Sequence, residues 1–362
     1  MAVKYNFNPG PSALPKEVLK KAENEMFNFK DSGLSVMEMS HRSTLYEEIH
    51  FEVISNIRNL LKVPENYKIL LLQGGASLQF AMLPMNFLTP GKKGAYVLTG
   101  SWAEKAYKEA EYFGQTSVIA STKNTDYTTI PDSIGINSFR DTAYIHLTSN
   151  NTIYGTQWSS FPPRKEIPVF IDASSDIFSR FIDWENTDLV YAGAQKNAGP
   201  AGTVIVILRD SLLEKVNSTI PLILSYSTHV KADSLYNTPP TLSIYMMGLV
   251  LKWIDRQGGI AAMERAAREK AKVLYNAIDS SEGFYKGYAA PKARSLMNIT
   301  FNLPSKQLEE RFLQMASEEG FSGLPGHRSI GGCRASLYNS VPQSHVNTLS
   351  SFMKNFEHKV KN

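Results

Sequence analysis

One lysine stands among small residues in the segment Tyr191-Ala-Gly-Ala-Gln-Lys196-Asn-Ala-Gly-Pro-Ala-Gly202. Apolar runs that are typical of buried strands flank it, Asp188-Leu-Val-Tyr191 before and Thr203-Val-Ile-Val-Ile-Leu208 after. Lys196 is therefore predicted to lie in a turn at a strand end, where α/β proteins often place their chemistry. Its small neighbours would let a flat or anionic group approach the backbone closely.

The sequence around Lys196 is compatible with two roles for this residue. Most lysines are solvated surface charges, and Lys196 could be one of them. A desolvated lysine has a lowered pKa and readily forms a Schiff base, which suits an aldehyde cofactor, pyridoxal phosphate being the commonest. Such a cofactor requires a carboxylate for its pyridine nitrogen, a phosphate site, an aromatic side chain against its ring, and cations for the substrate.

The overall composition is that of an ordinary globular protein. The chain has 362 residues, of which 43% are hydrophobic, and a formal net charge of +4. This length favours two domains. The net charge is small and the basic residues do not form runs, so we expect no nucleic-acid partner.

The composition also predicts where the protein works. A single cysteine, Cys333, excludes an internal disulfide and fits a reducing compartment. The segment Met1–Asn8 lacks the apolar core of a signal peptide, and no apolar run is long enough to span a bilayer. We therefore expect a cytoplasmic protein without a membrane partner. The histidines show no metal-ligand spacing, so we expect no metal site.

Strand-like and helix-like segments alternate along most of the chain. The strand-like runs are 68–73, 95–98, 117–120, 143–148 and 168–172, with helical patterns such as 46–61 and 104–113 between them. This alternation predicts a mostly parallel sheet covered by helices. Beyond about residue 258 the pattern changes to that of a smaller α/β domain, with helices at 261–278, 308–319 and 346–359 and a strand at 295–301.

A glycine turn joins the strand-like run 68–73 to a helical pattern through Gly74-Gly75-Ala76-Ser77. A strand, a glycine turn and a helix start form a phosphate site, because free backbone N–H groups and the helix dipole favour an anion there. Ser77 would add a hydroxyl donor. The alternative is a plain tight turn in which Ser77 caps the helix.

Three further residues follow predicted strands. Asp172 ends an apolar run, and an ionised carboxylate there would keep a pyridine nitrogen protonated. Trp102 could stack on a cofactor ring, or it could be a core tryptophan. Thr152 could donate to a phenolic oxygen, or it could serve only its turn.

Two basic clusters could bind substrate anions. The first is His41-Arg42, in a polar loop before a helix, and the second is His327-Arg328 with Arg334, among glycines. A substrate that carries a carboxylate and a phosphate needs several converging cations, and the planar fork of arginine binds such groups in a bidentate manner. Either cluster could instead be a basic surface feature.

Together these residues resemble the fold-type I pyridoxal-phosphate enzymes of the class V aminotransferases, and within them the phosphoserine aminotransferase family. Four stretches carry the narrower resemblance, and they run from near the first residue to near the last: Asn8-Pro-Gly-Pro-Ser12, Met39-Ser-His41-Arg42-Ser43, Tyr236-Asn237-Thr238-Pro239-Pro240 and Gly326-His327-Arg328-Ser-Ile-Gly-Gly-Cys-Arg334-Ala-Ser-Leu-Tyr-Asn339.

The resemblance implies a role for each residue. Lys196 would hold pyridoxal 5'-phosphate and move the substrate proton. The other cofactor-binding residues would be Ala76, Ser77, Trp102, Thr152, Asp172, Gln195 and, from the neighbouring subunit of a homodimer, Asn237 and Thr238. The substrate would meet His41, Arg42, His327, Arg328 and Arg334, with Arg42 and Arg334 on its α-carboxylate. Some family members have an arginine where this chain has Ser77, so phosphate binding here is expected to depend more on backbone N–H groups.

The resemblance also implies an architecture and a reaction. The large domain would span residues 15–258 around a mostly parallel seven-stranded sheet, and residues 1–14 and 259–362 would form the smaller α/β domain. The reaction would be a ping-pong transamination between L-glutamate and 3-phosphohydroxypyruvate, giving O-phospho-L-serine and 2-oxoglutarate in serine biosynthesis. A second product that the resemblance allows is 4-phosphohydroxy-L-threonine, in vitamin B6 synthesis.

Three other functions compete with this one. A cysteine desulfurase would need a nucleophilic cysteine on a mobile loop, for which Cys333 is the sole candidate. A cofactor-free Schiff-base aldolase would explain Lys196 but leave Asp172 and the glycine turn without a role. A non-catalytic binding protein would explain the basic clusters, and its binding to nucleic acid would be steeply salt-dependent.

Overall fold

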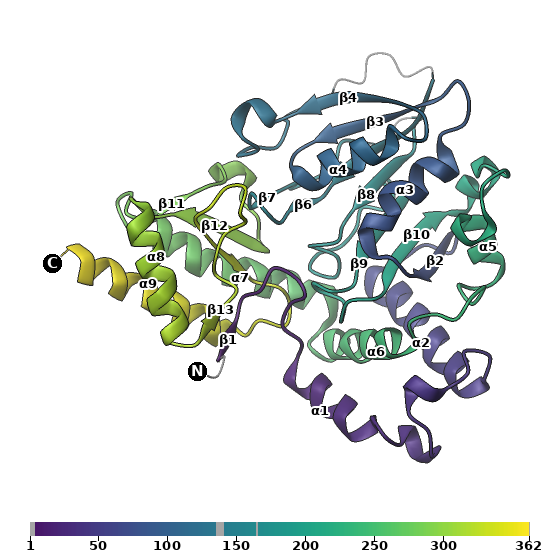
Figure 1. Cartoon of the computed structure of the whole chain (residues 1–362), viewed down its shortest axis with the longest axis horizontal. Helices are drawn as coiled ribbons and strands as arrows, with labels where there is room; N and C mark the ends of the chain where they lie inside the picture. The colour runs from purple at the N-terminus through teal and green to yellow at the C-terminus, as the bar shows by residue number, and fades with distance from the viewer. Residues whose placement is uncertain (1–3, 135–140, 164–165, 362) are drawn as a thin grey trace.

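The computed structural model describes residues 4–134, 141–163 and 166–361. A seven-stranded sheet forms its centre within these ranges (Figure 1). The strand order is β2 (Tyr67–Leu72), β10 (Val204–Arg209), β9 (Leu189–Gly193), β8 (Val169–Asp172), β5 (Thr142–Thr148), β3 (Lys93–Leu98) and β4 (Gln115–Ser121). Only β10 runs antiparallel to its neighbours among these strands, so the prediction of a mostly parallel sheet is confirmed.

Helices cover both faces of the sheet, because alternate strand residues point to opposite sides. In β2, Ile69 and Leu71 pack with α2 (Thr44–Leu61) and α6 (Thr241–Arg256), whereas Leu70 and Leu72 pack with α3 (Gly75–Phe87) and α4 (Ser101–Ala110). The first of these two layers also includes α1 (Lys16–Glu25), and α5 (Tyr226–Lys231) joins the second. This three-layer arrangement leaves the carboxyl ends of the parallel strands open for a site.

The C-terminal part of the chain forms a second, smaller α/β unit (Figure 1). Its sheet has the order β11 (Lys286–Gly287), β12 (Asn298–Asn302) and β14 (Cys333–Ser336), and its helices are α7 (Gly259–Asp279), α8 (Lys306–Glu318) and α9 (Gln343–Lys361). The strand at 295–301 predicted from the sequence begins three residues later, at Asn298, because the backbone N–H groups of Leu296 and Met297 donate to the side chains of Gln157 and Ser295 and not to a neighbouring strand.

The N-terminal residues pack with this second unit. Strand β1 (Tyr5–Asn6) pairs in parallel with β13 (Phe321–Ser322), and Phe7 lies in the same apolar cluster as Phe301 and Phe312. We therefore propose the division given by the sequence, with residues 15–258 in one domain and residues 1–14 and 259–362 in the other.

A short hairpin, β6 (Asn150–Asn151) and β7 (Thr156–Gln157), extends from the end of β5 toward the second unit. In residues 4–134, 141–163 and 166–361, none of the helices combines the length and the apolar character that a membrane span requires.

The aromatic core of the second unit offers a test of the domain division. Phe312 is fully buried, and its ring lies 5.2 Å from those of Phe352 and Phe356. The substitution Phe312→Ala should lower the free energy of unfolding of this unit by about 3–5 kcal/mol. All four tryptophans lie between residues 102 and 253, so fluorescence reports the larger unit, whereas circular dichroism reports both.

In urea, the variant should show a circular dichroism transition that begins before the fluorescence transition. The matched control is Phe87→Ala, which removes a buried ring from the larger unit and should move the fluorescence transition instead. Two transitions that stay coincident in the Phe312→Ala variant would contradict the proposed division.

Candidate active site

A cavity of about 440 Å³ opens at the carboxyl edge of the large sheet, around Lys196. Lys196 follows β9 in the turn that leads to β10, so the predicted placement between two strands is confirmed. Its Nζ donates a hydrogen bond to the Thr152 hydroxyl at 3.0 Å, and the Ser12 hydroxyl donates to its backbone carbonyl. Gly10 lies so close that an added Cβ would stand 3.2 Å from the Lys196 Cγ.

The structure gathers most of the predicted site residues in the walls of this cavity. These are Ala76, Ser77, Trp102, Thr152, Asp172, Gln195, Lys196, His327 and Arg334. They come from segments far apart in the sequence, including the starts of α3 and α4, the turn after β6, the end of β8, and β14 of the second unit. The cavity therefore lies between the two units, as is common for small-molecule sites.

The surroundings of Lys196 lower the pKa of its amine to about 8, from an ordinary value of 10.5. Burial is the main cause, because a charged ammonium loses hydration there. The negative charge of Asp172 acts in the opposite direction, and the positive charge of Arg334 lowers the pKa further. A substantial fraction of Lys196 is therefore neutral near physiological pH, as a Schiff-base-forming amine requires.

Asp172 ends β8 as a buried carboxyl group. Burial raises its pKa, whereas hydrogen bonds from Ser174 and the charge of Lys196 lower it. The backbone N–H of Ser174 donates to its Oδ1 at 2.9 Å. The hydrogen bond from Ser174 thus holds the carboxylate in place near the positive charge of Lys196, where it can face a ring nitrogen.

A tyrosine and a histidine lie behind Asp172 within the sheet. Tyr191 of β9 is directly beside Asp172, and burial together with a hydrogen bond to Asp172 raises the pKa of its hydroxyl. The His146 Nε2 lies 2.9 Å from the Tyr191 hydroxyl oxygen. Burial lowers the pKa of His146 to about 3, so the ring stays neutral and adds no charge beside Asp172.

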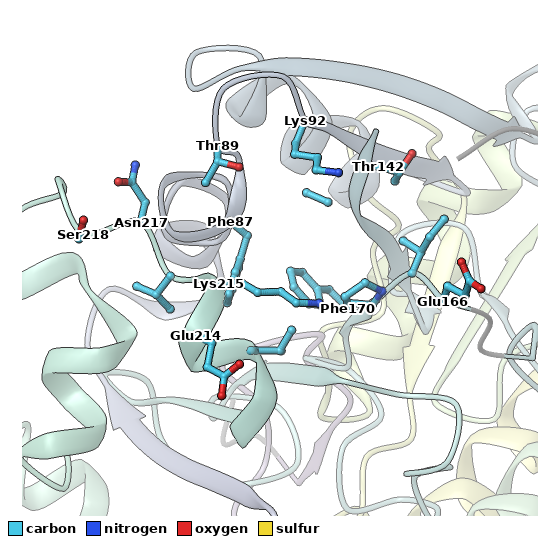
Figure 2. Close-up of a pocket in the computed structure, with 15 residues that line it drawn as sticks. Phe87, Thr89, Lys92, Thr142, Glu166, Phe170, Glu214, Lys215, Asn217 and Ser218 are labelled. Carbon is cyan, nitrogen blue, oxygen red and sulfur yellow. The ribbon is translucent and has the colours of Figure 1, made fainter. Parts of the chain in front are cut away.

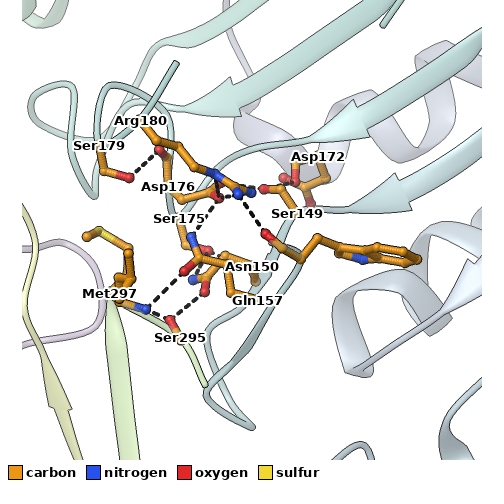
Figure 3. Close-up of polar contacts among 12 residues, drawn as sticks. Ser149, Asn150, Gln157, Asp172, Ser175, Asp176, Ser179, Arg180, Ser295 and Met297 are labelled. Atoms are coloured by element: carbon orange, nitrogen blue, oxygen red, sulfur yellow. Dashed lines mark hydrogen bonds and ion pairs between the residues drawn. The ribbon is translucent and has the colours of Figure 1, made fainter. Parts of the chain in front are cut away.

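A second buried carboxylate, Asp176, is paired within a network of polar side chains near Asp172 (Figure 3). Arg180 Nη2 lies 2.9 Å from its Oδ2, and Gln157 Nε2 donates to the same oxygen at 3.0 Å. The Ser149 hydroxyl donates to the other carboxylate oxygen. This compensation lets Asp176 be buried without an unpaired charge close to the site.

The start of α3 supplies an anion site at one end of the cavity. Gly74 and Gly75 both have positive φ, at 79° and 62°, and the N-cap side chain makes no hydrogen bond because it is glycine. The first backbone N–H groups of a helix have no partner within the helix. Those at Gly75, Ala76 and Ser77 can therefore bind an anion with the help of the helix dipole.

Two polar atoms in the cavity walls indicate that a ring-shaped ligand fits here. The Trp102 Nε1 and the Thr148 Oγ1 are buried and have no hydrogen-bond partner among the described residues. The Trp102 ring lies 5.9 Å from the Lys196 Nζ. An aromatic face, a lysine amine, a carboxylate and a phosphate-binding helix start meet in one cavity, which matches the requirements of pyridoxal phosphate.

The substrate side of the cavity is cationic. Arg334 is buried, and its Nη1 donates to the Thr152 carbonyl at 3.1 Å. Burial lowers the pKa of His327, and the charges of Arg334, Arg328 and Lys105 lower it further. An anionic ligand would stabilise this group of like charges.

Five predicted residues do not line the cavity of their own chain: His41, Arg42, Asn237, Thr238 and Arg328. Arg42, Asn237 and Thr238 are exposed. Arg328 follows His327 directly, whereas the other four lie on two other loops, with His41 and Arg42 on one and Asn237 and Thr238 on the other. Their predicted roles remain predictions.

The cavity also includes polar residues that were not predicted. They are Thr148, Asn150, Ser174 and Ser175, which flank or follow the carboxyl ends of β5 and β8. Their position after two buried strands was the available signal, since side chains at that edge of a parallel sheet share one space.

A larger cavity, of about 1200 Å³, lies elsewhere (Figure 2). Its walls include Lys92, Thr142 and Pro168, which stand at or just before the starts of β3, β5 and β8. It therefore lies at the amino edge of the sheet, and none of the predicted site residues lines it. Size alone does not identify the site.

Comparison with known proteins agrees with this geometry. The family model for class-V aminotransferases matches residues 4–349. A phosphoserine aminotransferase from Lysinibacillus sphaericus is 56% identical over 98% of this chain and 98% of its own length.

Solved structures show the same similarity. The phosphoserine aminotransferase from Bacillus circulans subsp. alkalophilus has a TM-score of 0.96 at 49% identity, covering 98% of both chains. The phosphoserine aminotransferase from Trichomonas vaginalis, solved with pyridoxal phosphate bound, has a TM-score of 0.90 at 37% identity, covering 97% of this chain and 99% of that one. The chain belongs to the class-V aminotransferases, and within them to the phosphoserine aminotransferase family.

Proposed function

We propose that the chain transfers an amino group from L-glutamate to 3-phosphohydroxypyruvate in a ping-pong reaction, giving O-phospho-L-serine and 2-oxoglutarate. The observation that carries this proposal is the shared cavity, which is lined by Lys196 and Asp172 together with the basic residues His327 and Arg334. Membership of the family narrows the chemistry to this exchange, with serine biosynthesis in the cytoplasm as the setting.

The cofactor is pyridoxal 5'-phosphate, and each part of it has a candidate partner in the cavity. When bound, it supplies an aldehyde that takes up amines and a pyridine ring that accepts the electron pair left on the substrate Cα. We assign its phosphate to the N–H groups at Ala76 and Ser77, its ring face to Trp102 and its ring nitrogen to Asp172. Thr152 and Gln195 would bond its polar edge.

Lys196 has two tasks in this proposal. Its neutral amine forms the covalent link to the cofactor, for which a pKa of about 8 is suited. With the cofactor and substrate bound, the same amine would be placed to take the proton that leaves the substrate Cα. Burial raises the pKa of the Asp172 carboxyl, and the hydrogen bonds from Ser174 and the charge of Lys196 oppose that effect by favouring its charged form.

We assign the basic side chains to different groups of the substrate. Arg334 and Arg42 are assigned to the α-carboxylate, which both substrates share. His41, His327 and Arg328 are assigned to the phosphate, which only the phosphorylated substrate has. Loss of one such charge-assisted contact costs about 1.5–3 kcal/mol, so this set is sufficient for a strong preference for phosphorylated substrates.

We further propose that the active form is a homodimer with shared sites. His41, Arg42, Asn237 and Thr238 lie outside the cavity of their own chain, so a second subunit is the natural source of these contacts. Apolar side chains are also exposed on this part of the molecule, including Phe27, of which 88% is accessible, and Leu222, of which 62% is accessible. Burial of such side chains stabilises a two-fold interface.

The competing functions explain the structure less well. Cys333 lies buried within β14, and burial raises the pKa of its thiol, so it is neither mobile nor activated as a desulfurase nucleophile. A cofactor-free aldolase would leave Asp172 and the start of α3 without a role. A non-catalytic binding protein does not need a lysine with a pKa lowered to about 8.

The pKa of Lys196 predicts how the apoenzyme takes up its cofactor. Only the neutral amine is a nucleophile, so the uptake rate should rise with pH, with a midpoint near 8, and then level off. Arg334→Gln removes a charge that lowers this pKa, and the midpoint should move to higher pH. Stopped-flow absorbance at a series of pH values measures both effects.

The matched control for charge is Arg265→Gln, on an exposed part of α7, which should leave the midpoint unchanged. An uptake rate that keeps increasing up to the ordinary lysine pKa of 10.5 would contradict the proposed desolvation of Lys196.

Hybrid dimers test the shared sites. Lys196→Ala and Arg42→Ala subunits, each nearly inactive alone, should regain activity when they are refolded together. One of the two sites in each hybrid then has both intact residues, so the mixture should reach about a quarter of wild-type activity.

If Lys196 and Arg42 of the same subunit served one site, no hybrid would contain an intact site. A mixture no more active than the separate variants would therefore contradict the assignment of Arg42 to the neighbouring subunit. Refolded wild-type protein serves as the control for recovery.

A further inference from the structure

A buried hydrogen bond between two asparagines joins the β6–β7 hairpin to the second unit. Asn150 of β6 donates from Nδ2 to Oδ1 of Asn298 in β12, at 2.8 Å. Both side chains are fully buried. The residues around Asn150 are shown in Figure 3, where polar side chains of both units meet in one network.

Both amides have their hydrogen bonds satisfied. The Asn150 Oδ1 accepts from the Ser295 hydroxyl at 2.5 Å, and its Nδ2 also donates to Ser175 at 2.8 Å. The Asn298 Nδ2 donates to the Ser336 hydroxyl at 3.0 Å and to the Tyr338 hydroxyl at 3.3 Å. Breaking the contact would leave buried polar groups unpaired, so it holds the two units firmly together.

The strand register connects this contact to the substrate side of the cavity. In the antiparallel pair of β12 and β14, Asn298 is opposite Ser336 and Thr300 is opposite Arg334. Residues two apart in a strand point to the same face, so Asn298 and Arg334 lie on one face of this sheet. That face meets the hairpin, since Arg334 Nη1 donates to the Thr152 carbonyl just beyond β6.

We propose that Asn298 is a positioning residue for Arg334. Its hydrogen bond with Asn150 fixes the position of β12 and β14 relative to the hairpin. The Arg334 guanidinium is thereby held where it can bind the substrate α-carboxylate. Asn298 does not line the cavity, so it acts through Arg334 and through no contact of its own with substrate or cofactor. The inference rests on the proposed function, because it takes Arg334 as the ligand of that carboxylate.

The test is a set of four proteins: wild type, Asn298→Ala, Arg334→Lys and the double variant. Asn298→Ala should raise the KM for both L-glutamate and L-phosphoserine, on the order of tenfold, as expected when a charge-assisted contact is loosened. The dissociation constant of the cofactor, read from its visible band, should stay within about twofold of wild type because the cofactor contacts remain. In the Arg334→Lys background the same substitution should have almost no further effect.

Asn302→Ala is the matched control. It removes the same side chain from the same strand, but Asn302 bonds Glu309 of α8 and not the hairpin. It should leave both KM values unchanged. An equal rise in KM for this control would show that the effect is a general loosening of the strand, and would overturn the proposal.

The possible failures can be told apart. If Arg334→Lys leaves the KM values unchanged, the proposed role of Arg334 is wrong, and the inference falls with it. If Arg334→Lys raises them but the effect of Asn298→Ala is absent or simply additive, the proposed function stands and the positioning role is overturned. If Asn298→Ala does not fold, Asn298→Asp keeps an oxygen to accept from Asn150. A crystal structure of that variant should retain the Arg334 contact with the Thr152 carbonyl, and its loss with the Asn150 bond intact would contradict the proposal.

Discussion

The desolvation of Lys196 beside Asp172 is the constraint on which the rest of the site depends. A buried ammonium is costly, and burial accordingly lowers the pKa of this amine to about 8. The buried carboxylate of Asp172 limits that shift, and Lys196 in turn favours the ionised form of Asp172. One pair of groups thus provides both a reactive amine and a fixed negative charge for a ring nitrogen.

The surrounding structure keeps that pair isolated and oriented. Neutral His146 and protonated Tyr191 stand behind Asp172 without adding charge, and Arg180 neutralises the neighbouring Asp176. Arg334 and His327 also line the cavity. Thr152 connects the lysine to this basic group, because its hydroxyl accepts from Lys196 and its carbonyl accepts from Arg334. The reactive amine, the buried carboxylate and the basic side chains therefore share one cavity.

Much of this could be predicted from the sequence, because apolar runs broken by small or polar residues indicate strand ends at one edge of a parallel sheet. The turn that carries Lys196, the position of Asp172 and the helix start at Gly75 follow from that rule. Contacts between buried polar residues could not be predicted, since spacing does not reveal that Asn150 meets Asn298.

The most direct test of the account is the visible absorption spectrum of the purified protein with pyridoxal phosphate, recorded before and after L-phosphoserine or L-serine is added. We expect a yellow absorption band that depends on Lys196, bleaches with phosphoserine and hardly changes with serine. Equal bleaching by both amino acids would contradict the assignment of the cationic wall to a phosphate. If no band forms at all, Lys196 does not hold the cofactor.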